Sequence, residues 1–169
     1  MTELELLEVE STVFIVSSKS FETTETLEIA KFIQKWGERE LSNKGIDPDI
    51  IRKYFYAITA NPPKAEELNI PSDNIFEIWD WVGGRYSVWS SMGLSIALTL
   101  GYKKFREFLD GAYAMDNHFI SEPWEKNIPI IMSLITIWNR NFKGFSSQAI
   151  LPYSDLLAFL PAYLQQLTM

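Results

Sequence analysis

Two short apolar runs separated by a helical pattern constrain the fold of this chain more than any other feature. Residues 11–16 (STVFIV) are rich in β-branched side chains and predict a buried strand, and residues 54–60 (YFYAITA) predict a second one. Apolar residues recur at helical spacing over residues 23–41, between the two runs. Because strands that alternate with helices favour a parallel sheet covered on both faces, we expect that arrangement here.

The rest of the chain continues the alternation. Residues 75–81 are either a third strand or an extended approach to a site. Beyond them we expect a buried central helix that follows Arg85 and reaches Leu100, and then an amphipathic helix over residues 105–115. A further helix is predicted over residues 128–142, with Pro129 in its first turn. The chain should end with a short strand at Ile150 and Leu151 and a helical stripe from Leu156 to Leu167, which Pro161 kinks or restarts.

These patterns together predict an α/β fold, a three-layer α/β/α sandwich around a parallel sheet. The 169 residues fit a single domain, and a hydrophobic fraction of 47% suffices for a sizeable core. Two nearly apolar runs, VWSSMGLSIALTLG and IPIIMSLITIW, are shorter than the ~20 residues that span a bilayer. We therefore expect them to be buried helices and expect no membrane partner.

Charge and residue usage narrow the classes of function. The net charge of −7, from 15 basic and 22 acidic residues, disfavours nucleic acid as a partner but leaves a small anionic ligand open. The chain has no cysteine and a single histidine, so we expect no disulfide and no metal site. The absence of cysteine and of a signal-peptide pattern favours a cytoplasmic location.

The first candidate site is the hydroxyl-rich stretch that follows the first predicted strand (FIVSSKSFETTET). Ligands of α/β sheets bind beyond the carboxyl ends of the strands, and a helix N-terminus favours anions. Ser18, Ser20 and Thr23 can donate hydroxyl hydrogen bonds, while Lys19 either adds charge or points elsewhere. An ordinary turn with one hydroxyl capping the helix explains the pattern about as well. Glu22 would repel a phosphate and should then point to solvent.

The second candidate is Gly83–Gly84–Arg85, within DWVGGRYSVWSSMG. Paired glycines allow the backbone to approach a ligand closely. An arginine at the head of a buried helix needs an acid, a carbonyl or an anionic ligand as partner. A structural ion pair with Asp80 is the alternative to a functional role.

His118 is the only histidine, a side-chain type that can act as an acid or a base at neutral pH, and Asp116 lies two residues before it. An acid–base role is open, but a helix-end histidine that caps or packs is the more ordinary explanation.

Several segments resemble the phosphoglucose isomerase family: SKSFETTET, DWVGGRYSVWSSMG, AMDNHF, NIPIIMSLITIWNRNF, and ILPYS followed by YLQQLTM. They stand in the family's order and cover nearly the whole chain. The resemblance implies a sugar-isomerase (SIS) domain of flavodoxin-like architecture. It also implies interconversion of glucose 6-phosphate and fructose 6-phosphate through a cis-enediolate, without a cofactor, in glycolysis and gluconeogenesis.

The resemblance assigns roles to individual residues. Arg85 matches the arginine that stabilises the enediolate, and Gln166 matches a substrate-contacting glutamine. Serine stands at position 20, where the family usually has threonine, so the hydroxyl is retained. Glu22 stands where the family often has threonine, so we expect no donor from it. The resemblance also implies that Ser18, Lys19, Ser20 and Thr23 lie in the phosphate-binding loop.

The family's motif continues from the position of Met169 directly to a glutamate, which is the catalytic base. The resemblance therefore implies an excised SIS domain of a larger two-domain enzyme, usually a homodimer, and no turnover by these residues alone. Two other readings stay open at this point. One is a stand-alone SIS module that senses a sugar phosphate, and the other is a structural or interaction domain. A domain excised from a larger protein and an interaction domain would both expose aromatic surface.

Overall fold

The computed structural model describes residues 3–169, and their contacts divide them into two compact units. Unit 1 ends at Leu94, and unit 2 begins at Ser95. Each unit is described by itself below.

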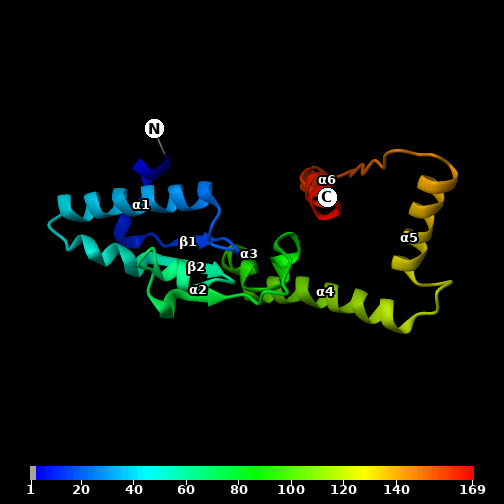
Figure 1. Cartoon of the computed structure of the whole chain (residues 1–169), viewed down its shortest axis with the longest axis horizontal. Coiled ribbons are helices and arrows are strands. Elements are labelled where there is room, and N and C mark those ends of the chain that lie inside the picture. The colour runs from blue at the N-terminus through cyan, green and yellow to red at the C-terminus, as the bar shows by residue number, and fades with distance from the viewer. Residues whose placement is uncertain (1–2) are drawn as a thin grey trace. The chain divides into compact units, whose positions relative to one another are not determined.

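Unit 1 is built on a parallel sheet of three strands (Figure 1). The strand order is β1-β2-β3, where β1 is Phe14–Ser17, β2 is Phe55–Thr59 and β3 is Ile75–Glu77. Strand β1 pairs in parallel with β2, and β2 pairs in parallel with β3. Helix α1 (Thr24–Asn43) joins the first two strands, and the short α2 (Pro62–Glu66) follows the second. The predicted α/β class and parallel sheet are thus confirmed, and residues 75–77 form a true third strand.

The central strand β2 anchors the core of unit 1. Phe55, Ala57 and Ile58 are completely buried, because helices and neighbouring strands cover both faces of β2. Helix α1 packs against the 3-10 helix Pro48–Tyr54, and Gly37 lies at their closest approach. A Cβ atom at position 37 would stand only 2.4 Å from Cδ1 of Ile51, so glycine lets the two elements approach.

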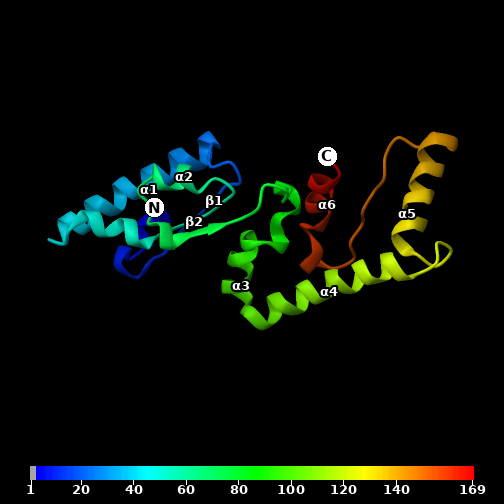
Figure 2. The same cartoon turned by 60° about the horizontal axis from the view of Figure 1, so that its bottom comes forward.

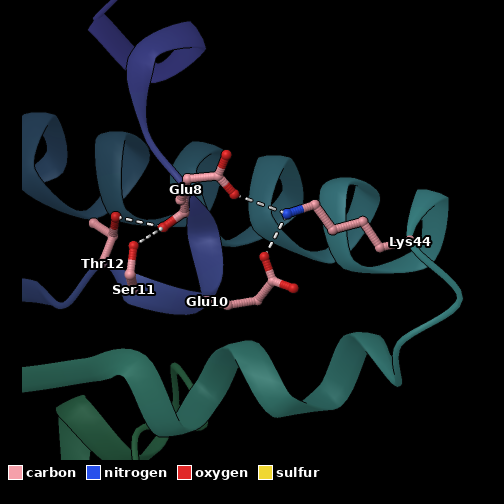
Figure 3. A network of polar contacts seen from close by, with 5 residues as sticks. All are labelled: Glu8, Glu10, Ser11, Thr12 and Lys44. Carbon is pink, nitrogen blue, oxygen red and sulfur yellow. Dashed lines mark hydrogen bonds and ion pairs between the residues drawn. The ribbon is translucent and has the colours of Figure 1, made fainter.

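An ion-pair network ties the N-terminal segment to the end of α1 (Figure 3). The Lys44 ammonium donates to the carboxylates of Glu10 and Glu8. Hydrogen bonding to Glu10, and then to Glu8, raises the pKa of Lys44 above its ordinary value of 10.5. Nearby, the hydroxyls of Ser11 and Thr12 donate to the backbone carbonyl of Glu8. The network holds the 3-10 helix Val9–Ser11 against α1, with Val9 buried between them.

Among its described residues, unit 2 contains helices and no strand (Figure 2). Helix α3 (Leu94–Leu100) crosses the boundary, and α4 (Tyr102–Ser121), α5 (Ile128–Ile137) and α6 (Leu160–Thr168) follow it. Buried Asn127 fixes the turn between α4 and α5. Its Nδ2 donates to the carbonyls of Phe119 (2.8 Å) and Glu122 (3.3 Å), and its Oδ1 accepts from the Ile130 amide (3.4 Å). One side chain thus terminates α4 and caps α5.

Several helical predictions for unit 2 are confirmed. Pro129 lies in the first turn of α5, whose last turn continues as the π-helix Trp138–Phe142. Pro161 restarts a helix, because it lies in the first turn of α6 and needs no intrahelical acceptor there.

Three predictions are wrong. The run IPIIMSLITIW is helical, but it is not a buried helix, since no residue of α5 is buried. The apolar run after Arg85 is not one buried helix. It forms the 3-10 helices Gly84–Trp89 and Ser91–Gly93 and then α3, which buries no residue. Serine hydroxyls compete with backbone amides for the carbonyl acceptors of this run. Ser87 donates to the Gly84 carbonyl and Ser90 donates to the Ser87 carbonyl, both at 2.6 Å. Residues 150–151 form no strand, because no described strand pairs with them.

Buried apolar side chains are distributed unevenly along the chain. Every buried hydrophobic residue described lies at or before Val82. Unit 2 instead exposes many large apolar side chains, among them Trp124, Trp138 and Phe159. This bears out the expectation of exposed aromatic surface. Over the part of the chain that the structure describes, no helix is both long and apolar enough to cross a membrane.

Candidate functional site

The hydroxyl-rich loop, residues 18–23, lies where β1 ends and α1 begins. Two polar contacts hold it against the carboxyl end of β2. The Ser18 amide donates to the Ile58 carbonyl (3.1 Å), and the Lys19 carbonyl accepts from the Ala60 amide (2.9 Å). The Thr59 hydroxyl also donates to the Lys19 carbonyl (3.0 Å). The loop is therefore fixed by the ends of two adjacent parallel strands, the position where α/β sheets bind ligands.

Phe21 gives the loop its shape. Its φ of +54° lies in the left-handed region, which costs a non-glycine residue about 1–2 kcal/mol. The ring is only 1% exposed and packs in the main hydrophobic cluster of unit 1. Burial of the ring offsets the backbone cost, so the core of the unit holds the loop in a conformation that it would not favour alone.

The loop offers several hydrogen-bond donors to an anion. The hydroxyls of Ser18 and Thr23 are 3.3 Å apart, and the Ser20 hydroxyl accepts from the Glu22 amide at 3.3 Å. Among the described residues, the amides of Lys19, Ser20 and Thr23 have no hydrogen-bond acceptor. Donors gathered in a left-handed turn beside a helix N-terminus form an anion-binding concavity.

The alternative explanation, that one hydroxyl caps the helix, finds no support. Thr23 is the N-cap residue of α1, and its side chain makes no capping hydrogen bond. The first amides of the helix therefore keep their donors available, as helix geometry requires of an uncapped end. Glu22 is exposed, as expected for a carboxylate beside an anion site.

The loop forms one wall of a pocket of about 610 Å³. Asn61 and Asp80 also line this pocket. Asp80 was named from the sequence only as an ion-pair partner of Arg85, and Asn61 was not named. The Asn61 Nδ2 donates to the Ser20 carbonyl at 3.4 Å, so the loop is also held from the side of β2. A signal for Asn61 was present, since it follows a predicted parallel strand at its carboxyl end. The lining residues are Lys19, Ser20, Thr23, Ala60, Asn61 and Asp80.

The Lys19 side chain bonds to the backbone of a distant segment. Its ammonium donates to the backbone carbonyl of Asp80 at 2.8 Å. Among the described residues no carboxylate lies within ion-pair distance of it, so its positive charge at the pocket is not neutralised.

Arg85 is exposed and is the second residue of the 3-10 helix Gly84–Trp89, five residues beyond Asp80. It does not line the pocket, and it makes no ion pair with Asp80 or with any other described residue. The structural ion pair considered for Arg85 is thus not formed.

Two other singled-out side chains belong to unit 2. Gln166 is exposed on α6. The Nε2 of His118 accepts from the Ile128 amide at 3.0 Å, at the first turn of α5. His118 therefore acts as a capping residue, which confirms the ordinary explanation for it. Among the described residues, no three His, Cys, Asp or Glu side chains gather to hold a metal ion.

Comparison with known proteins identifies the family. The family model described as phosphoglucose isomerase matches residues 1–169, the whole chain. The chain belongs to the phosphoglucose isomerase family. The match includes both the hydroxyl-rich loop and the Gly-Gly-Arg segment.

Curated relatives and solved structures agree with this assignment. Glucose-6-phosphate isomerase of Chlorobium phaeobacteroides is 48% identical over 166 residues, which are 98% of this chain and 29% of the relative. Glucose-6-phosphate isomerase 1 of Colwellia psychrerythraea is 50% identical over 163 residues, 96% of this chain and 29% of the relative. The crystal structure of a glucose-6-phosphate isomerase from Chlamydia trachomatis superimposes with a TM-score of 0.79 at 32% identity, covering 96% of this chain and 30% of that one. The chain thus spans under a third of the length of these isomerases.

Proposed function

We propose that this chain forms part of a glucose-6-phosphate isomerase, which interconverts glucose 6-phosphate and fructose 6-phosphate through a cis-enediolate. In this proposal the loop of residues 18–23 holds the sugar phosphate. The observation that carries it is the pocket at the ends of β1 and β2, where hydroxyls and unpaired amides gather beside an uncapped helix. Family membership supports the same reaction.

Each proposed role follows from the charge that the reaction develops. Removing a proton beside a carbonyl places negative charge on oxygen, and a fixed guanidinium stabilises that charge more in the transition state than in the ground state. Arg85 takes this role, which is worth about 2.7–4 kcal/mol by analogy with other oxyanion-stabilising donors. Ser18, Ser20 and Thr23 donate to the phosphate, and Gln166 contacts the sugar.

Proton transfer then needs a base from the part of the isomerase that lies outside these 169 residues. Acid–base help of this kind is worth about 10²–10⁴-fold in rate. We therefore propose that the 169-residue chain binds sugar phosphate without turning it over.

The test is an NMR titration of the isotope-labelled chain with inorganic phosphate and, separately, with fructose 6-phosphate. We expect amide shifts at residues 18–24 and at Asn61 with both ligands. Ser20→Ala should weaken binding by about tenfold or more, since a hydrogen bond to a charged group is worth ~1.5–3 kcal/mol. Ser42→Ala, at the other end of α1, is the matched control and should leave affinity unchanged. Equal affinity in the two variants, or no shift at the loop in the folded chain, refutes the site.

A further inference from the structure

Lys19 joins two segments that are 61 residues apart in the sequence. Its ammonium donates to the backbone carbonyl of Asp80, and both residues line the pocket. The segment that contains Asp80 is also bonded to β2, because the Ile78 amide donates to the Thr59 carbonyl at 2.8 Å. The loop and residues 78–80 are thus connected once through β2 and once directly through Lys19.

A continuous series of turns runs from Asp80 to Arg85. The Val82 amide donates to the Trp79 carbonyl (2.9 Å), and the Val82 side chain is buried. The next turn closes when the Tyr86 amide donates to the Gly83 carbonyl (3.0 Å). The two hydrogen-bonded turns, residues 79–82 and 83–86, are consecutive, so only the Val82–Gly83 peptide bond separates the turn that contains Asp80 from the turn that contains Arg85.

Lys19 is well suited to hold this connection. It is half-buried and has no carboxylate partner among the described residues, so nothing there competes with the Asp80 carbonyl for its ammonium. The bond uses one of the three ammonium protons and leaves the positive charge at the pocket.

We propose that Lys19 is a positioning residue that sets the distance between the phosphate loop and Arg85. The inference rests on the proposed function, in which the loop holds one end of the substrate and Arg85 stabilises charge near the other. A rigid substrate engages both only if their separation is fixed, and a displacement of about 1 Å can cost ~100-fold in rate. Lys19 therefore acts through Arg85 and not as a ligand of the phosphate.

The first experiment needs no ligand. Amide shifts and hydrogen exchange of the 169-residue chain are compared between wild type, Lys19→Met and Lys19→Arg. Methionine keeps the apolar stem and removes the donor, whereas arginine keeps a donor. We expect Lys19→Met to shift the Trp81 amide and to accelerate exchange at Val82 and Tyr86 by at least threefold, and Lys19→Arg to restore both.

The matched control for this comparison is Lys64→Met. Lys64 is also half-buried in unit 1, but its ammonium bonds, among the described residues, to Glu67 alone, at 3.4 Å. This control should leave Trp81, Val82 and Tyr86 unchanged. If Lys19→Met behaves like Lys64→Met, the connection does not exist and the proposal is overturned.

The second experiment adds inorganic phosphate and separates the two roles. In wild type we expect shifts at the loop and also at Gly84 and Arg85. In Lys19→Met the loop should still respond with an affinity within threefold of wild type, while the response at Gly84 and Arg85 is lost. A tenfold loss of affinity with the Arg85 response retained makes Lys19 a phosphate ligand and overturns the proposal. Absence of any loop response in wild type would count against the proposed function alone, because the ligand-free comparison tests the connection independently.

Discussion

Replacement of Gly37 by alanine tests the packing of α1, because the higher helix propensity of alanine stabilises the chain while the added Cβ atom crowds the core. Alanine is favoured over glycine inside a helix by about 1 kcal/mol. In this helix, however, the added Cβ would lie 2.4 Å from Cδ1 and 2.8 Å from Cγ1 of completely buried Ile51. Carbon pairs prefer about 3.5–4.0 Å, and overpacking of a core costs roughly 1–3 kcal/mol. Taking the middle of that range, we expect Gly37→Ala to destabilise the chain by about 1 kcal/mol.

The measurement is urea unfolding followed by far-ultraviolet circular dichroism. With a slope of about 2 kcal/mol per molar urea, the expected loss lowers the midpoint by ~0.5 M. The decisive comparison repeats the change in an Ile51→Ala background, where both crowding atoms are absent. There Gly37→Ala should stabilise by about 1 kcal/mol, because only the helical preference remains. The same sign in both backgrounds refutes the packing argument. Gly111→Ala on α4, where the added Cβ meets nothing within 4 Å, is the control and should be stabilising.

Three further predictions concern single side chains. Because the pKa of Lys44 is raised in the folded chain, the contribution of Lys44 to stability is fully present below the ordinary pKa of 10.5 and is lost as the pH rises through the folded-state pKa. The urea midpoints of wild type and Lys44→Met should therefore differ at neutral pH and converge in strong alkali. Asn127→Ala should destabilise the α4–α5 turn by about 1–3 kcal/mol, because it removes a cap and leaves carbonyls without donors, and hydrogen exchange at Ile130 should accelerate accordingly; unchanged exchange would contradict the capping role. Phe21→Ala should cost about 3–5 kcal/mol in urea unfolding, whereas Phe21→Leu, which keeps an apolar anchor, should cost clearly less.

The sequence predicted the sheet of unit 1 well because short runs of apolar and β-branched residues indicate its strands without reference to the rest of the chain. The strand predicted at residues 54–60 is observed as Phe55–Thr59, and the one predicted at residues 11–16 is observed as Phe14–Ser17. The hydroxyl-rich loop was equally visible, since its composition and its place after a strand are sequence properties. The exposure of the apolar side chains of unit 2 could not be predicted from local sequence, because an apolar run has the same sequence whether or not another element covers it.

Features that depend on distant contacts were missed. The bond from Lys19 to Asp80 joins residues far apart in the chain, and no local pattern indicates it. The break-up of the run after Arg85 depends on which carbonyls the hydroxyls of Ser87 and Ser90 reach, and periodicity does not record that choice. Asn61 differs from these features, because its place after the carboxyl end of the second predicted strand is itself a sequence property that indicates the site.

The uneven distribution of buried side chains has a consequence for biosynthesis. A ribosome releases the chain from its N-terminus, so the segment that contains every described buried hydrophobic residue emerges first and can assemble its core early. The helices that emerge afterwards carry bare tryptophan and phenylalanine side chains, and such surface is recognised by chaperones and promotes aggregation. Expression of this chain should therefore give more soluble material at low temperature and with co-expressed chaperones, and the gain should come from protection of α4, α5 and α6.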